Sequence, residues 1–587
     1  MARVLNWRWS LVAAVTVAIA LGGSAQAAPE KVRAKADGKK PEAAKAETKP
    51  KAAAPNLPPR PKKTITPPSL TAAEIDSLMD KYLASSKVPV ASPTTDVEFV
   101  RRAHLDLTGR PPAPEQVVGF MRTKLPDKRA KLIEYLLNQP EYAENWAHYW
   151  RDVIQFHATN QNGNQVQYGE FEKWLAKQLE KNRPWDEVAR EMITATGMTN
   201  EENGTALQVA HEAQAPELAG EISRVFMGIQ IQCAQCHDHP TDSWKREQFH
   251  EFAAFFAGAR VRQVGDGKGA QREFELVAQG RPQYKMPDKA DPTKQIPVAP
   301  RFFLASDSKP LPAGLTAEER RHVAADYITS QDNPWFAKAF VNRVWYVLMG
   351  DGFNSPVDDM GPEREAKAPE VLDVIASQWA KGGYDIKWLF RTIMNTQTYQ
   401  REIRSTYSAS GKVPFAAVAP ARLRADQILD SLSEAHGPAF GGGGGPAAAT
   451  KKKGAVAADR KSAVPKTKGA QRNGNRGLFD NLFGIDPSTP YDDVLGTIPQ
   501  ALYLMNGAQI NSAMKANPNT VLGQILMSTP DNRRALDMLY LRVLARDPTQ
   551  KELKVLTGYI QKVGSRTEAF EDILWSLINS TEFITRR

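Results

Sequence analysis

Cys233, Cys236 and His237 are the residues of this chain whose types and spacing most clearly predict chemistry. They form a Cys-x-x-Cys-His motif, residues 233–237, which holds the only two cysteines among 587 residues. This spacing is the attachment signature of a c-type haem. Two thiols one helical turn apart can bond to both vinyl groups of one porphyrin, and the adjacent imidazole then ligates the iron. We therefore expect Cys233 and Cys236 to be thioether anchors and His237 to be the proximal ligand.

Two other kinds of site use the same residues. In an oxidising compartment a Cys-x-x-Cys pair forms a disulfide or acts as a redox dithiol. Zinc needs four ligands, and Cys233, Cys236, His237 and His239 all lie within seven residues. Zinc ribbons and fingers bring their second ligand pair from a distant segment, so such a cage would be unusually compact. Haem c, zinc and a cofactor-free disulfide all remain open.

A distal haem ligand has to come from another segment. Met286 lies about fifty residues downstream in a Pro-rich stretch, and cytochromes c take an axial Met from such loops. We expect Met286 in this role, with Met227, His250, His157 and His211 as competing candidates. His239 is too near His237 to reach the opposite haem face.

Apolar side chains are dense on both sides of the motif. They can wrap a porphyrin, or they can form an ordinary helix core. The set comprises Phe226, Ile229, Ile231, Trp244, Phe249, Phe252, Phe255 and Phe256.

The first 27 residues predict an export signal. Arg3 and Arg8 give a positive start, residues 11–21 are apolar, and residues 25–27 offer a small-residue cleavage site. The apolar run is too short to span a bilayer, and no later stretch suggests a span. We expect a periplasmic or secreted protein with no transmembrane span in the mature chain.

The net charge of +10 comes from two low-complexity segments. Residues 28–63 hold eleven Lys/Arg against four Asp/Glu, and residues 437–476 hold nine against one, so the remaining chain is mildly acidic. These Ala/Lys/Pro-rich and Gly/Lys-rich compositions cannot bury enough apolar surface to fold. We expect a disordered linker over 28–67 and a disordered insertion over 437–476, in loose contact with anionic envelope polymers and not with nucleic acid.

The ordered regions are predicted to be mainly α. Apolar residues recur at helical spacing after a capping Thr71, behind Pro216, and in five later segments. Strand signals are scarce, and the best of them predict a small irregular or β element near 260–300. The five later segments are 337–348, 371–379, 386–394, 422–432 and 535–543.

A short pattern of an apolar residue, Asn and an aromatic residue recurs at offsets of six and four. Asn tolerates the left-handed conformation that ends helices and also caps the next helix, so we expect tight helix corners plugged by the aromatic ring. The regions near 96–145 and 534–587 also match each other in the residues that precede this pattern. This indicates either related modules or the general residue preferences of helix corners. The three copies are Leu132, Asn138 and Tyr142; Leu389, Asn395 and Tyr399; and Ile573, Asn579 and Phe583.

Signatures of other enzyme classes are thin. The chain has no phosphate-binding Gly-rich loop and no Ser nucleophile elbow. Asp358 and Asp359 are expected to be solvated in a loop. Three basic residues suit either an anionic substrate or helix-face ion pairs to Asp426 or Asp430, and we expect the ion pairs: Arg343, Arg422 and Arg424.

Longer matches give a family resemblance. Residues 99–112, 146–152, 226–240 and 252–258, and then 332–334, 341–345, 385–387, 398–399, 422–430, 502–506 and 579–583, carry it. In them the chain resembles the planctomycete cytochrome C 2 family over 68–310, followed by the planctomycete-specific domain 1 family over 312–587. The resemblance implies two multi-helix domains, and the cytochrome name reflects the motif at 233–237.

Two functional hypotheses follow. The first is an exported cell-envelope protein that binds one c-type haem for electron transfer or redox chemistry with an unidentified redox partner. The second is a non-haem helical scaffold or binding protein of the envelope, whose Cys233 and Cys236 form a disulfide or hold zinc.

Overall fold

Helices form most of the chain, as its periodicity predicted. The computed structural model describes residues 61–586 except 86–88, 161, 164, 266, 268–271, 305–307, 405–406, 409–410, 438–439, 441–474 and 495. The predicted export signal, most of the predicted linker and nearly all of the predicted insertion lie outside the described residues. By its contacts the chain divides into Met1–Ala54 and Pro55–Arg587, and every described residue belongs to the second unit.

The first half of this unit is a series of helices interrupted near residue 197. Thr71 begins the first helix as predicted, because its hydroxyl accepts a hydrogen bond from the Glu74 amide. The helices are α1 (Ala72–Ala84), α2 (Asp96–Thr108), α3 (Pro114–Arg122), α4 (Lys128–Leu137), α5 (Pro140–Gln155), α6 (Tyr168–Glu180), α7 (Trp185–Thr194), α8 (Ala206–Val209), α9 (Ala215–Met227), the 3₁₀ helix η1 (Gln232–Gln235), α10 (Arg246–Ala253) and η2 (Ala254–Phe256).

The second half is also helical, and the predicted segments coincide with α12, α13, α14, α15 and α21. The segment predicted from residue 422 starts three residues later, because Arg424 is the extended residue that precedes the helix. These helices are α11 (Ala317–Ile328), α12 (Pro334–Met349), α13 (Pro369–Lys381), α14 (Ile386–Met394), α15 (Ala425–His436), α17 (Asn475–Phe483), η4 (Tyr491–Asp493), α18 (Ile498–Asn506), α19 (Ala508–Ala513), α20 (Val521–Ser528), α21 (Asn532–Leu544), α22 (Gln550–Val563) and α23 (Arg566–Ile578).

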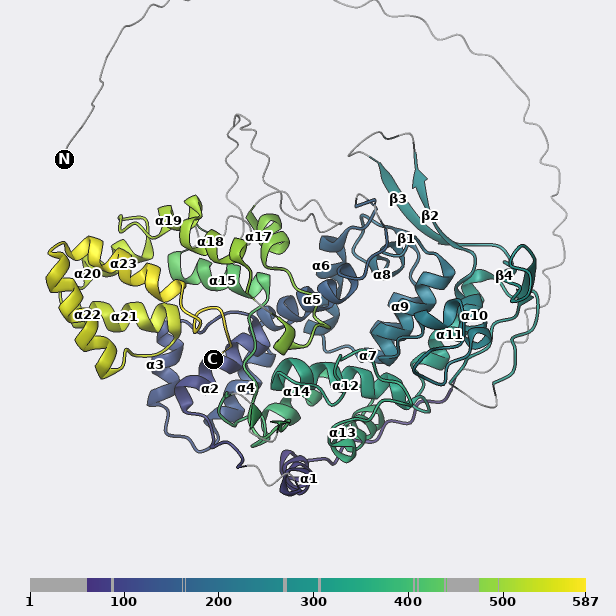
Figure 1. Cartoon of the computed structure of the whole chain (residues 1–587), viewed down its shortest axis with the longest axis horizontal. Coiled ribbons are helices and arrows are strands. Elements are labelled where there is room, and N and C mark those ends of the chain that lie inside the picture. The colour runs from purple at the N-terminus through teal and green to yellow at the C-terminus, as the bar shows by residue number, and fades with distance from the viewer. Residues whose placement is uncertain are drawn as a thin grey trace, which may run out of the picture. The chain divides into compact units, whose positions relative to one another are not determined.

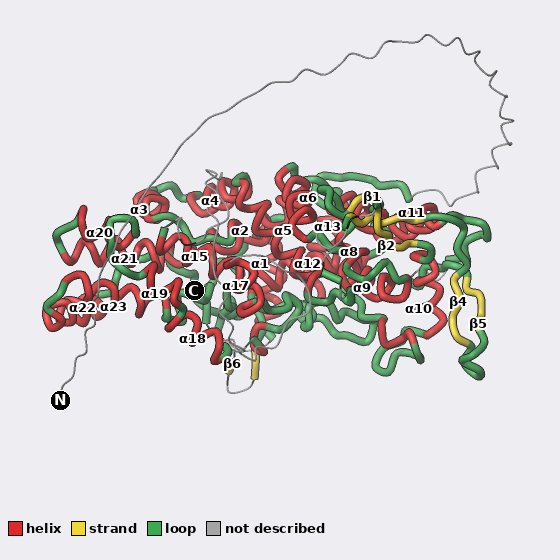
Figure 2. Tube along the Cα trace, turned by 90° about the horizontal axis from the view of Figure 1, so that it is seen from above, coloured by secondary structure: helices red, strands yellow, loops and turns green. Residues whose placement is uncertain are grey.

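The described strands are short, and most lie near the predicted β element. They are β1 (Gly197–Met198), β2 (Ala259–Val264), β3 (Glu273–Ala278), β4 (Tyr284–Pro287), β5 (Gln295–Val298), β6 (Tyr407–Ser408) and β7 (Gly411–Lys412). β3 pairs antiparallel with β1 and β2, whereas β4 and β5 form a separate antiparallel pair with Met286 opposite Ile296. Figure 2 shows these strands as small patches on an otherwise helical trace. The mainly α prediction is confirmed.

The buried apolar side chains form two cores. The first runs from Ile75 to Val418 with Ala545 added, and the second runs from Leu423 to Phe583 with Leu105 of α2 added. In Figure 1 helices α20–α23 lie at one end of the unit, and α9–α11 with β1–β4 lie at the other. Of the described helices, none is at once long and apolar enough to cross a bilayer.

The recurring Asn pattern marks three helix ends, although not in the conformation we predicted. Asn138, Asn395 and Asn579 follow α4, α14 and α23, and their φ angles of −102°, −84° and −86° are not left-handed. Each side-chain amide instead donates to the carbonyl oxygen four residues earlier, at 2.8, 2.8 and 2.9 Å. At Asn138 this bond satisfies an end carbonyl of α4, whereas the carbonyl groups of Arg391 and Trp575 also accept from the backbone amides of Asn395 and Asn579. The aromatic residue of each copy is buried: Tyr142, Tyr399 and Phe583.

Candidate functional site

The cysteine motif (residues 233–237) lies on the turn that follows α9. Gly228 ends α9 with φ of 67°, and a Cβ atom there would come within 2.7 Å of the Met360 sulfur, so glycine suits this corner. Ala234 is fully buried and anchors η1, whereas Cys233 and Cys236 are exposed and unpaired. The fold therefore presents both thiols to solvent on one short turn.

His237 is exposed beside the two thiols, and its ring has one nitrogen already engaged. Nδ1 lies 2.7 Å from the carbonyl oxygen of Asp238, which acts as acceptor and so places the ring proton on Nδ1. The Asp238 carboxylate accepts from the Arg246 amide and the Lys245 ammonium, both at 3.1 Å. These bonds lower the pKa of Asp238. His237 Nε2 is left with its lone pair, the arrangement that an iron-ligating imidazole needs.

Met286, the predicted distal ligand, lies on β4 and is connected to the motif through α10. His250 approaches the Gln235 carbonyl oxygen with Nε2 at 3.0 Å and the Tyr284 hydroxyl with Nδ1 at 2.8 Å. Arg246 donates to the Pro287 carbonyl oxygen at 2.6 Å. These bonds hold β4 against the helix that follows the motif. Met286 itself is half-buried.

The competing distal candidates have other roles in the fold. Both ring nitrogens of His250 are occupied by the bonds that join η1 to β4. Met227 is fully buried in α9. His157 lies 2.8 Å from a carboxylate oxygen of Asp486, and buried His211 lies 3.8 Å from Glu221.

The apolar side chains around the motif form core rather than a surrounding wall. Phe252 contacts Phe256 and Phe303 edge-on, with ring centroids 5.2 and 5.1 Å apart. Every member of the predicted set is at most 8% exposed. The motif thus holds the donor set that a c-type haem requires, two free thiols and an open imidazole nitrogen. The residues fit a haem attached at the surface and do not enclose one.

The zinc hypothesis requires several ligands that are arranged around one ion. Within the described part of the chain, no group of three or more His, Cys, Asp or Glu side chains is arranged to hold a metal ion. His239 Nδ1 accepts a hydrogen bond from the Thr241 amide at 3.3 Å. The structure therefore does not bring Cys233, Cys236, His237 and His239 together as ligands.

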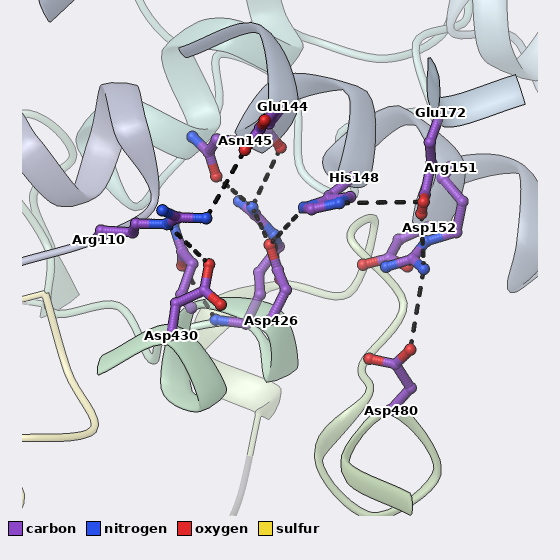
Figure 3. Close-up of polar contacts among 12 residues, drawn as sticks. Arg110, Glu144, Asn145, His148, Arg151, Asp152, Glu172, Asp426, Asp430 and Asp480 are labelled. Atoms are coloured by element: carbon purple, nitrogen blue, oxygen red, sulfur yellow. Dashed lines mark hydrogen bonds and ion pairs between the residues drawn. The ribbon is translucent and has the colours of Figure 1, made fainter. Parts of the chain in front are cut away.

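A second concentration of reactive groups lies in the interior, where α5, α6, α15 and α17 meet. We call it the ionic network. Figure 3 shows its side chains pointing toward one another from these helices. Its members are Asn145, His148, Arg151, Asp152, Glu172, Arg424, Asp426 and Asp480.

Asp426 is central to the network. Its carboxylate lies 2.9 Å from the Arg424 guanidinium and 3.6 Å from His148 Nδ1 (Figure 3). Burial alone would raise the pKa of Asp426, but Arg424 and His148 outweigh it and hold that pKa well below its usual range. Arg424 also donates to the Asn145 side-chain oxygen at 2.5 Å, so the pair joins α5 to the start of α15.

The other half of the network gathers around Arg151. Its guanidinium lies 2.6 Å from Asp152, 2.9 Å from Glu172 and 3.8 Å from Asp480. Burial raises the pKa of Asp152 to about 6, even though Arg151 opposes this shift. Two neighbouring carboxyl groups, Asp152 and Asp426, thus have pKa values pushed in opposite directions, which is a frequent property of functional sites.

A cavity of about 50 Å³ adjoins the network. Its walls come from the end of α2, from α5 and α12, from residues 421–427 and 484–494, and from Arg586. The ionisable side chains on these walls are Asp106, Tyr149, Asp152, Tyr346, Arg422, Arg424, Asp486, Tyr491 and Arg586.

Two sequence-based predictions about charged residues are corrected here. Asp358 is 1% exposed, not solvated, because it lies 2.5 Å from Arg224 and 3.8 Å from Arg343. Of the three predicted ion pairs to Asp426 or Asp430, only that of Arg424 forms. Arg343 pairs with Asp358, and Arg422 has no ion pair among the described residues.

Of the ionic network, sequence patterns predicted only the Arg424–Asp426 pair. A signal for the rest of the network was available in α5, where Asn145, His148 and Asp152 recur at offsets of three and four. This spacing places polar groups on one helix face, and the same helix has buried Trp146, Tyr149 and Trp150. A polar stripe inside an otherwise buried helix predicts partners on other elements, which sequence alone cannot name.

Comparison with known proteins gives families but no characterised relative. No curated protein and no solved structure matches the chain. Two family models match, each described as a protein of unknown function: PSCyt2 (DUF1549) over residues 74–261 and PSD1 (DUF1553) over residues 320–560. The second match crosses from the first apolar core into the second. The predicted resemblance is confirmed, and the chain belongs to the proteins that carry a PSCyt2 domain followed by a PSD1 domain.

Proposed function

We propose that this protein is an exported cell-envelope protein that carries one c-type haem on the cysteine motif and uses it for electron transfer or redox chemistry. The observation that supports the proposal best is the exposure of both thiols on one turn beside His237. These side chains add nothing to the core, so their spacing suits a group that attaches from outside.

The roles of the residues follow from their positions. Cys233 and Cys236 are the thioether anchors, and His237 offers Nε2 because Asp238 engages Nδ1. A bound haem supplies a one-electron carrier whose potential depends on its axial ligands and its exposure. The bonds from α10 to β4 keep Met286 on the strand next to this helix, as a distal ligand would require.

Export is the second part of the proposal. The charged start, short apolar run and small-residue site within residues 1–27 support it. Covalent haem attachment takes place after export in bacteria, so the two parts support each other. An exposed site would also be accessible to an envelope redox partner.

A non-haem scaffold with a reversible Cys233–Cys236 disulfide is the second candidate. The close packing of the apolar side chains around the motif favours this candidate, because these side chains are already buried against one another without a porphyrin. An exposed dithiol in an oxidising compartment is readily oxidised.

One preparation separates the candidates. The full chain is exported from a bacterial host that has haem-attachment machinery, and its intact mass and absorption spectrum are measured. We expect a mass increase of one haem and a Soret band, both lost in Cys233→Ala and His237→Ala. His239→Ala is the matched control and should keep both. Purified wild-type protein without haem, whose two cysteines are oxidised to a disulfide or which holds one zinc, would refute the haem proposal.

A further inference from the structure

Arg422 is the one charged residue on the cavity wall that lacks a counterion among the described residues. The other acidic and basic wall residues are paired. Arg586 lies 3.4 Å from Asp106, Arg151 lies 2.6 Å from Asp152, Arg424 lies 2.9 Å from Asp426, and His157 lies 2.8 Å from Asp486.

The surroundings of Arg422 leave part of its guanidinium without a hydrogen-bond partner. Its Nε and Nη1 atoms are covered and have no hydrogen-bond partner in the described structure. The guanidinium lies 5.7 Å from the Phe483 ring centroid. Burial lowers its pKa, and no carboxylate acts against that shift. Two covered N–H-bearing atoms without an acceptor are costly, so an acceptor supplied by a ligand would stabilise this half-buried side chain.

A second hollow, open to the surface, adjoins the cavity. This hollow has a volume of about 220 Å³. The two spaces share Ala421, Arg422, Tyr491 and Val494 as walls. Arg422 therefore borders both the outer hollow and the inner cavity.

The size and walls of the cavity limit the ligand. One enclosed water needs about 10–15 Å³, so a volume of about 50 Å³ admits a few waters or one small polyatomic ion. Burial raises the pKa of Tyr491 to about 12, so this wall residue is a neutral hydrogen-bond donor at pH 7 and does not repel an anion. Tyr346 stacks on Tyr491 with ring centroids 4.7 Å apart and fixes its position.

We propose that the cavity binds a single small oxyanion, held by the Arg422 guanidinium. Tetrahedral phosphate or sulfate and a planar carboxylate share the required chemistry, a compact anion with several acceptor oxygens. The cavity is too small to hold a nucleoside or a sugar in addition to the anion. The site is independent of the cysteine motif and of the proposed haem.

Binding is tested by calorimetry on the full exported chain, with inorganic phosphate, sulfate and acetate titrated separately at constant ionic strength against a chloride blank. We expect saturable binding of at least one oxyanion at a stoichiometry of one. Phosphate or sulfate alone would indicate a tetrahedral ligand, and acetate alone would indicate a carboxylate. Arg422→Gln should raise the Kd by about 10- to 100-fold, since it removes a charge-assisted bond.

Two controls keep the test decisive. Arg281→Gln removes an exposed arginine elsewhere and should leave the Kd unchanged. Arg422→Lys keeps the charge and should bind more tightly than Arg422→Gln, and circular dichroism of each variant verifies the fold. Absence of saturable binding for all three anions, or an unchanged Kd in a folded Arg422→Gln, would overturn the proposal.

Discussion

The cysteine motif and the ionic network are two groups of reactive side chains, one exposed and the other buried. At the motif, Cys233, Cys236 and His237 are exposed and make few contacts with the rest of the chain. In the network, Arg151 and Asp426 are at most 3% exposed and connect helices that are far apart in sequence.

We interpret this difference as one between a site that can react with other molecules and a site that stabilises the fold. Exposed groups contribute little to folding and remain free to react, whereas removing one partner of a buried ion pair leaves the other charge uncompensated. The network joins α5 of the PSCyt2 match to α15 of the PSD1 match. We therefore expect the two matched regions to depend on each other for stability, and the motif to contribute little to the stability of either.

Asp426→Ala is the substitution expected to change stability most. The variant removes the buried carboxylate that Arg424 and His148 share, and we expect the free energy of unfolding to fall by about 3–5 kcal/mol. Denaturant unfolding followed by circular dichroism measures the change. Asp238→Ala next to the motif is the control, because that carboxylate is fully exposed although it also pairs with a lysine. Equal losses in the two variants would remove the distinction.

The sequence could predict one side of this comparison and not the other. Spacing within five residues identified the cysteine motif, and periodicity identified α1, α9, α12 and α14, because such patterns are local. Arg224, which pairs with Asp358, and Asp426, which pairs with His148, each come from a segment more than a hundred residues away, so no local pattern contains these pairs. For the same reason the sequence did not show that Arg422 would remain unpaired.

A pH series extends the comparison to a buried histidine, His104, and a buried carboxyl group, Asp152. Burial lowers the pKa of His104 to about 4, whereas the unfolded chain binds a proton near 6.5. Since the unfolded state then holds more protons, the stability contributed by neutral His104 is lost as the pH falls through about 6.5 toward 4. Asp152, with a pKa raised to about 6, acts in the opposite sense, because its stabilising effect grows as the pH falls through 6.

The His104→Gln variant isolates the histidine contribution. Between pH 7 and pH 5 we expect wild type to lose about 2 kcal/mol more unfolding free energy than this variant does. Urea titrations at each pH measure the difference, and the contribution of Asp152 cancels because both proteins contain it. A wild-type curve that coincides with that of His104→Gln would contradict the buried assignment.

The smallest effect is expected at the motif itself, in the double variant Cys233→Ser, Cys236→Ser. Both side chains are exposed and neither forms a disulfide in the structure, so their replacement removes no buried surface. We expect the free energy of unfolding of the haem-free protein to change by less than about 0.5 kcal/mol. Denaturant unfolding under reducing conditions measures this. A loss comparable to that of Asp426→Ala would mean that the motif is a structural element, and its exposure could then no longer be used to argue for an attached group.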